Sequence, residues 1–153
     1  MKILMVCLGN ICRSPIAHGL LQHKVEKLGL DWEIDSAGTS DWHKGELPNE
    51  NSIKVMGRYG IDINYQRSRP IERKDLEYYD VIYVMDASNH ETVVTMAKSE
   101  AEIAKVLYIM NEVEPGKNQK VPDPWSLTEQ HYEDVYLMLD KATDKIIEKY
   151  NKK

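Results

Sequence analysis

The sequence is short of cysteine, of long apolar runs and of clustered positive charge. Only two cysteines occur, Cys7 and Cys12, and because both lie in one short segment they cannot staple distant parts of the chain. No apolar run approaches the about 20 residues of a membrane-spanning helix, and the first residues are typical of a buried strand rather than of a signal peptide. We therefore expect a cytoplasmic protein with no membrane insertion.

The sequence also lacks the features of nucleic-acid, nucleotide and metal sites. The net charge is −5, and no basic block occurs apart from Lys152-Lys153, so general nucleic-acid binding is not expected. No Gly-x4-Gly-Lys-Ser/Thr motif is present, and no histidine and aspartate residues have the spacing of metal ligands. We expect neither a metal nor another cofactor.

What is present is the composition of one globular domain, with 153 residues, 42% hydrophobic and 29% charged, and no repeats or linkers. Strand patterns alternate with helix patterns along residues 1–153. The predicted strands cover residues 3–6, 32–38, 79–85 and 106–109, and the predicted helices cover about 15–28, 48–59, 89–97 and 128–150. This order predicts a single-domain α/β fold, Rossmann-like, with a four-stranded parallel sheet and helices on both faces.

The most informative stretch is the loop that joins the first strand to the first helix. It begins at Cys7, and Arg13 follows after five residues. Ser14 and Pro15 predict the helix start, with Ser14 as the N-cap and Pro15 at the first helical position. Asp86 and Ser88 are likewise predicted to cap the helix that follows the third strand.

This loop predicts an anion site. The backbone N–H groups of such a loop point inward, and the helix behind it adds the positive end of its dipole. The same field stabilises a thiolate, so Cys7 is predicted to act as a nucleophile, and the Arg13 guanidinium can bind two oxygens of a phosphate or arsenate. Taken alone, the pattern also fits a buried structural cysteine followed by a surface arginine.

The sequence resembles the low-molecular-weight protein tyrosine phosphatases, including bacterial members, over essentially its whole length. The loop carries that family's signature, and three later segments occur in the family's order and spacing. The matching segments are Cys7-Leu8-Gly9-Asn10-Ile11-Cys12-Arg13-Ser14-Pro15-Ile16-Ala17, Asp35-Ser36-Ala37-Gly38-Thr39, Met85-Asp86-Ala87-Ser88-Asn89 and Asp123-Pro124-Trp125.

The resemblance implies hydrolysis of phosphotyrosine and small aryl phosphates through a phosphocysteine. Cys7 would attack, Arg13 would bind phosphate, and Asp123 would act as general acid and base, although Pro-Asp-Pro by itself reads as a turn. Trp42 and Trp125 would form the walls of the crevice. The remaining phosphate-binding residues that it implies are Leu8, Gly9, Asn10, Ile11, Cys12 and Ser14, with Ser14 also able to donate to the Cys7 thiolate.

The same resemblance implies a reversible disulfide between Cys7 and Cys12 that protects the nucleophile from over-oxidation. From the residues alone, Cys12 is equally a small apolar filler, and Trp42 has an alternative reading as a packing residue at the sheet edge, although we favour the crevice wall that the resemblance implies. The expected partner is a phosphotyrosine protein, with a tyrosine kinase as the family-level candidate, and the expected state is a monomer or weak dimer.

Three other functions stay open on the sequence. Relatives that act on phosphoarginine carry threonine where this chain has Ile11, and arsenate reductases of this fold need further cysteines, which do not occur after Cys12. A non-catalytic oxyanion-binding or redox-sensing module would need no general acid. One departure from the family is Gln66, which stands where a histidine commonly joins the network beneath the phosphate loop.

Overall fold

A computed structural model describes residues 1–152, so Lys153 of the Lys152-Lys153 tail lies outside the described residues. Its centre is one four-stranded sheet in the order β2-β1-β3-β4, in which every pairing is parallel. The strands are β1 (Lys2–Cys7), β2 (Glu33–Gly38), β3 (Val81–Val84) and β4 (Val106–Tyr108). The predicted α/β class and four-stranded parallel sheet are confirmed.

The β1 strand lies inside the sheet and is buried on both faces because almost all of its residues are apolar. Successive side chains of a strand alternate between faces. Ile3 and Met5 therefore join one apolar cluster, whereas Leu4 and Val6 join the other. The carboxyl end of β1 delivers Cys7 to the edge of the sheet where open α/β folds bind ligands.

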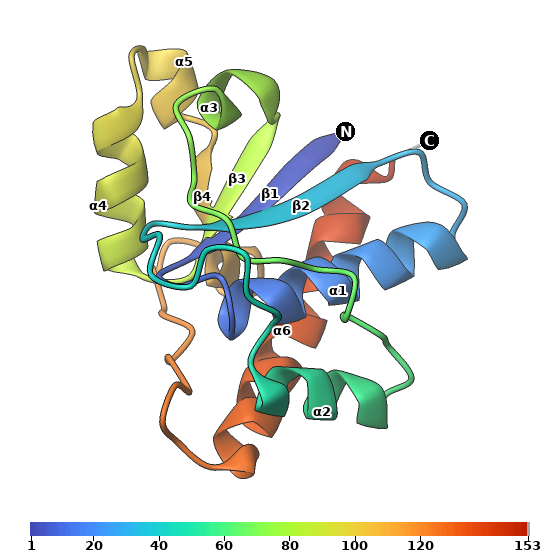
Figure 1. Cartoon of the computed structure of the whole chain (residues 1–153). Coiled ribbons are helices and arrows are strands. Elements are labelled where there is room, and N and C mark those ends of the chain that lie inside the picture. Colours follow the sequence, from blue (N-terminus) through green and yellow to red (C-terminus); the bar gives the residue numbers. More distant parts are fainter. Residues whose placement is uncertain (153) are drawn as a thin grey trace.

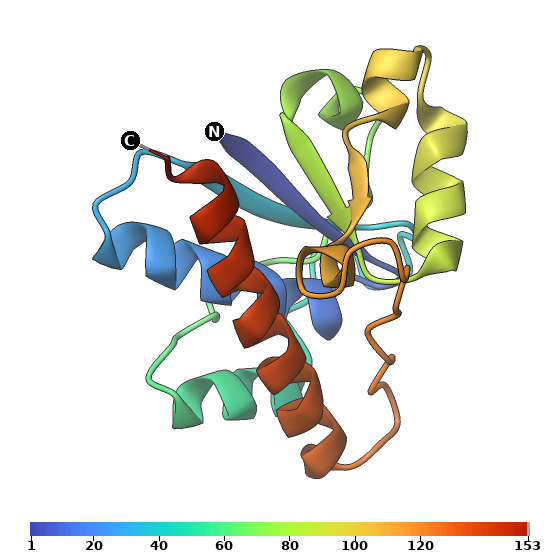
Figure 2. The same ribbon diagram turned by 180° about the vertical axis from the view of Figure 1, so that it is seen from behind.

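The larger cluster is covered by three helices, α1 (Arg13–Lys27), α2 (Glu50–Arg58) and α6 (Glu129–Tyr150). Figure 2 shows α6 running across α1 on this face. The apolar face predicted for the last helix is buried here and includes Tyr132, Val135, Leu139, Ala142 and Ile146. The last helix is therefore a core-covering helix, as its amphipathic pattern predicts.

The opposite face is covered by α3 (Asp75–Tyr78) and α4 (Ala87–Met96), next to α5 (Glu100–Ile103) (Figure 1). Leu76 and Val93 bring α3 and α4 into the smaller apolar cluster. Helices therefore lie on both faces of the sheet, as predicted.

Several local predictions need correction. The first helix begins at Arg13 rather than after Ser14, and its N-cap residue is Cys12, whose side chain makes no capping hydrogen bond. Asp86 caps α4 by accepting from the N–H of Asn89, as predicted, but Ser88 lies within that helix and is not its cap. The third strand is shorter than residues 79–85, and the fourth ends at Tyr108.

Three short helices were not predicted: α3, α5 and the 3-10 helix η1 (Ile109–Glu112). Each has only four residues, which is too few for a helical period to appear in the sequence. Across residues 1–152, no helix has the length and apolar character needed to cross a membrane.

Candidate active site

The loop between β1 and α1 turns its carbonyl groups outward. The carbonyl oxygens of Cys7 and Leu8 accept from the N–H groups of Thr39 and Ser40, and the Gly9 carbonyl accepts from the Ser68 hydroxyl. Farther along the loop, the carbonyls of residues 11 and 12 accept from residues 49 and 52. A loop held in this way presents its N–H groups to the concave side, which suits an anion.

A chain of polar contacts fixes Cys7 beneath the loop. Asn10 adopts a positive φ of 56° and accepts from the N–H of Arg69 at 3.1 Å, which orients its amide. Its Nδ2 donates to Ser14 Oγ at 2.8 Å, and Ser14 Oγ lies 3.0 Å from Cys7 Sγ. Because Ser14 accepts from Asn10, its one hydroxyl proton is available to donate to the sulfur of Cys7.

Arg13 is a buried cation that faces the same pocket. Its Nη1 donates to Asp86 Oδ2 at 2.7 Å and to the Val121 carbonyl at 3.0 Å. Burial disfavours the charged guanidinium, but the charge at Cys7 and the bond to Asp86 outweigh that cost and raise the pKa of Arg13. Within residues 1–152, Arg13 Nε has no hydrogen-bond partner, so it remains available to an incoming anion.

Cys12 differs from Cys7 in its surroundings. Its Sγ lies 3.5 Å from the Tyr132 hydroxyl under the loop. Burial raises the pKa of the Cys12 thiol to about 12, because desolvation disfavours the thiolate, although the Tyr132 hydrogen bond acts in the opposite direction. Both cysteines are free thiols here, so their reversible disulfide stays a prediction.

The pocket above Cys7 is narrow and has aromatic walls, with a cavity volume of about 70 Å³. Trp42 and Trp125 line it with 71% and 51% of their surfaces exposed, so both rings are accessible at the mouth. Trp42 thus lines the pocket and is largely exposed, which favours a pocket wall over a packing residue at the sheet edge, and its contact with a substrate ring stays a prediction.

Asp123 lies at the same mouth, on the segment that precedes α6. Its Oδ2 is 3.8 Å from Arg13 Nη2, and its Oδ1 accepts from the N–H of Trp125 at 3.1 Å. The Asp123 side chain thus forms a side-chain turn with Trp125, and a backbone turn follows in which the N–H of Leu127 donates to the Pro124 carbonyl, with the carboxylate at the pocket that contains Cys7. The two readings of this segment are compatible.

The structure brings most of the predicted site residues together. One pocket is lined by Cys7, Leu8, Gly9, Ile11, Cys12, Arg13, Trp42, Asp123 and Trp125. Asn10 and Ser14 are not among the lining residues, and their side chains lie beneath the loop in the hydrogen-bond chain to sulfur. The side chains of these two residues therefore support the loop from below and do not line the pocket.

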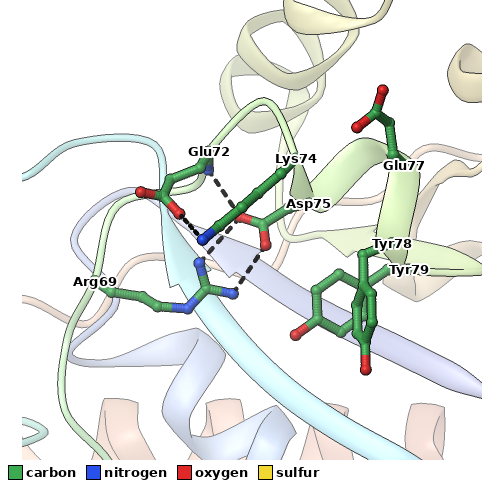
Figure 3. A pocket seen from close by; sticks show the side chains of 7 residues that line it. All are labelled: Arg69, Glu72, Lys74, Asp75, Glu77, Tyr78 and Tyr79. Carbon is green, nitrogen blue, oxygen red and sulfur yellow. Dashed lines mark hydrogen bonds and ion pairs between the residues drawn. The ribbon is translucent and has the colours of Figure 1, made fainter.

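Sequence reasoning missed three residues of this neighbourhood. Asp86 was assigned only a capping role, yet it also holds Arg13. His43 lines the pocket with its ring 5.5 Å from that of Trp125, and its place beside Trp42 was the available signal. Arg69 supports Asn10 through its main chain, and its side chain is paired with Asp75, as Figure 3 shows.

Gln66 is buried beneath the first turn of α1. Its Nε2 donates to the Pro15 carbonyl at 3.1 Å, and in residues 1–152 its buried Oε1 has no hydrogen-bond partner. The residue at the usual histidine position therefore contacts the helix start, and within residues 1–152 no hydrogen bond joins it to Asn10.

Comparison with known proteins gives one family across the chain. The family model of low molecular weight phosphotyrosine protein phosphatase matches residues 2–153. The low molecular weight protein-tyrosine-phosphatase YfkJ of Bacillus subtilis is 38% identical over 128 residues, covering 81% of this chain and 80% of the relative.

Solved structures agree with this fold. A protein tyrosine phosphatase from Entamoeba histolytica superposes with a TM-score of 0.92 at 31% identity, covering 99% of this chain and 97% of that one. The Drosophila arginine phosphatase superposes with the same TM-score of 0.92 at 28% identity, covering 99% of both chains.

Proposed function

The chain belongs to the low molecular weight phosphotyrosine protein phosphatase family and is a protein-tyrosine phosphatase, and on that premise we propose which of its residues carry the reaction. Cys7 is the nucleophile, Arg13 is the phosphate-binding cation, and Asp123 is the general acid and base. Support for these roles comes from one pocket that all three line, at the carboxyl end of β1.

In the first step, the Cys7 thiolate attacks phosphorus and the bond to the tyrosyl oxygen breaks. Asp123 gives its proton to that oxygen, which leaves as a neutral phenol. Arg13 Nε and the N–H groups of residues 8–13 bind the equatorial oxygens, over which the transition state spreads its charge. Ser14 donates to the sulfur and thereby keeps it ionised and oriented.

In the second step, water replaces sulfur on phosphorus. The Asp123 carboxylate takes a proton from the water as it attacks phosphocysteine, and Cys7 leaves as a thiolate with release of inorganic phosphate. Asp86 stays bonded to Arg13 through both steps. This bond keeps the guanidinium fixed while the charge on the phosphoryl group changes.

The substrate is a phosphoprotein, and we propose phosphotyrosine as its reacting group. The thiol is at the floor of a narrow pocket whose walls are two exposed tryptophans. A flat aryl phosphate fits between them, whereas the shorter phosphoserine would leave the rings without a partner.

One arrangement carries this proposal. Arg13 Nε has no hydrogen-bond partner within residues 1–152, Arg13 lines the same pocket as the buried Cys7 thiol, and the carbonyls of the loop between them point outward. The test is hydrolysis of p-nitrophenyl phosphate at mildly acidic pH with EDTA, for the wild type and Cys7→Ser. We expect turnover by the wild type and none by the variant. A folded, reduced wild type without turnover would favour the non-catalytic oxyanion-binding or redox-sensing module.

One similar structure raises phosphoarginine as a second substrate class without favouring it. The Drosophila arginine phosphatase has the same fold over 99% of this chain, so the scaffold itself does not decide between phosphotyrosine and phosphoarginine. Ile11 lines the pocket and is only 6% exposed, so its side chain bounds the space beside the phosphate. Its apolar surface favours an aromatic leaving group over a guanidinium.

We predict that Ile11→Thr raises phosphoarginine turnover relative to phosphotyrosine turnover. Threonine adds a hydroxyl that can accept from a guanidinium and removes apolar surface from the wall. The measurement is the ratio of the two kcat/KM values, which we expect to change by about tenfold, the lower end of the range for one altered pocket contact. An unchanged ratio would show that Ile11 does not select the substrate.

We further propose a cytoplasmic enzyme, monomer or weak dimer, whose phosphotyrosine substrates include a tyrosine kinase. Support comes from the family resemblance. Arsenate reduction is disfavoured because the chain has no cysteine after Cys12. Dephosphorylation of an autophosphorylated kinase by the wild type, and not by Cys7→Ser, tests the kinase assignment.

A further inference from the structure

His18 is a buried ionisable residue that the proposed mechanism does not use. It lies on α1, is 6% exposed, and its Nδ1 lies 3.0 Å from Ser36 Oγ. Ser36 on β2 is itself buried. The ring of Tyr65 packs edge-on against the imidazole at 5.7 Å. Burying a polar side chain costs free energy unless a hydrogen bond compensates for the lost water, so the contact with Ser36 is important for His18.

The residue before Ser36 on β2 is Asp35, whose carboxylate holds Arg69. The Ser36 N–H donates to Asp35 Oδ1 at 2.8 Å. Asp35 Oδ2 accepts from Arg69 Nε and also lies 3.3 Å from Arg69 Nη2. On its other side, the guanidinium is paired with Asp75, the contact drawn in Figure 3. The Arg69 side chain is therefore fixed from two elements.

Arg69 transmits this fixed position to the phosphate loop. Its N–H donates to Asn10 Oδ1, and its carbonyl accepts from the N–H of Gly38 at 2.8 Å. Asn10 in turn donates to Ser14, which contacts the sulfur of Cys7. Ser14 and His18 are four residues apart on α1, about one helical turn. These polar contacts, together with the main chain of Ser36 and Arg69 and one turn of α1, thus connect His18 to the phosphate loop from both sides.

Burial, rather than the surrounding charges, favours the neutral form of the His18 imidazole. Burial lowers the pKa of His18 to about 4, with Arg69 acting in the same direction and Asp35 opposing it. The groups that face it are Asp35 on β2 and Arg69 and Tyr65 on the segment between α2 and α3. A second cation here would repel Arg69 and compete for Asp35.

We propose that His18 is a positioning residue of the phosphate loop, acting through Ser36, Asp35 and Arg69 to hold Asn10 and Ser14 against Cys7. This inference rests on the proposed function of the loop. It adds that the helix behind the loop orients the loop through a side chain, besides its dipole and its first N–H groups.

The first test is binding of inorganic phosphate to the reduced protein, which does not require turnover. We expect His18→Leu, which keeps the bulk and removes the hydrogen bond, to weaken phosphate binding and lower kcat by about tenfold, the range seen for residues that couple through a network. His18→Asn places a polar atom near the position of Nδ1 and should restore both values to within about threefold.

The matched control is His23→Leu, an exposed histidine on the same helix, for which we expect no change in either value. Ser36→Ala breaks the same contact from β2 and should reproduce the loss, and the double variant should lose no more than either single one. This variant also covers the case in which His18→Leu fails to fold.

Two results would overturn the proposal. One is phosphate binding by His18→Leu or Ser36→Ala equal to that of the wild type. The other is a His18→Asn variant as weak as His18→Leu, because packing and not the hydrogen bond would then matter. A wild type that binds phosphate with the expected pattern across the variants but has no phosphatase activity would refute the proposed function and leave this inference standing.

Discussion

Different nitrogens of Arg13 have different surroundings. Its Nη1 is committed to Asp86 and to the Val121 carbonyl, whereas Nε lies buried without a partner in residues 1–152. A buried donor without an acceptor costs free energy, and a phosphate oxygen would remove that cost. The guanidinium is therefore preorganised for an anion.

Asp123 has two possible roles, giving a proton to the leaving oxygen and holding the local turn, and two variants distinguish them. We predict that Asp123→Ala lowers kcat by about 100-fold or more, because the leaving oxygen then departs without a proton. Asp123→Asn is the matched control, since its side-chain oxygen can still accept from the N–H of Trp125. Equal losses in both variants point to the proton, whereas an active Asp123→Asn would assign the residue to the turn alone. The measurement is steady-state hydrolysis of an aryl phosphate.

Of the three residues proposed to carry the reaction, Cys7 and Arg13 were indicated by residue type and spacing, whereas Asp123 was singled out by the family resemblance. Cys7 and Arg13 needed only the strand, the loop and the helix start around them. The role of Asp86 was not visible, because it comes from a contact across 73 residues of sequence. Likewise, no local pattern links Arg69 to Asn10.

At the scale of elements, the start of α1 shows how a tertiary contact overrides a local rule. Ser14 before Pro15 is a favourable N-cap pair, yet the helix begins one residue before Ser14. The hydroxyl of Ser14 instead lies between Asn10 and Cys7. The helix therefore starts without a side-chain cap, and the Ser14 hydroxyl is free to donate to the sulfur of Cys7.

The end of β2 is packed directly against the phosphate loop, and Gly38 is the residue that permits it. A Cβ at this position would lie 2.8 Å from the Leu8 carbonyl oxygen and 3.1 Å from Gly9 C. We predict that Gly38→Ala lowers the free energy of unfolding by about 1–3 kcal/mol, as overpacking does. It should also weaken phosphate binding, because the loop must shift. Urea unfolding and phosphate titration measure the two effects.

Gly57 is the control for that substitution. It lies inside α2, and a Cβ there would meet no heavy atom within 4 Å. Gly57→Ala should raise the free energy of unfolding by about 0.5–1 kcal/mol, since alanine restricts the unfolded chain and favours the helix. A Gly38→Ala variant as stable as Gly57→Ala would show that the loop accommodates the methyl group.

At the scale of the whole molecule, the buried His18 couples stability to pH. Burial lowers the pKa of His18 to about 4, whereas an unfolded histidine titrates near ~6.5. Between these values the unfolded chain binds a proton that the folded protein does not, so stability falls as pH falls from about 6.5 toward 4. The slope from this one group is at most about 1.4 kcal/mol per pH unit.

Urea unfolding of the wild type and of His18→Asn between pH 4 and 7 measures this contribution. We expect the variant to lose most of the slope above pH 5, where few carboxylates titrate. Equal slopes in the two proteins would mean that His18 is not the group responsible.

The sequence by itself determined the fold class and the order of strands and helices, and it indicated Cys7 and Arg13 as candidate site residues, because these follow from apolar periodicity and from short-range spacing. The tertiary structure alone decided which carboxylate holds Arg13, where Asp123 lies relative to Cys7, and what supports the loop from below. Those contacts join residues 34 to 110 positions apart. Their free energy arises only when the sheet has brought the segments together, so no local pattern records them.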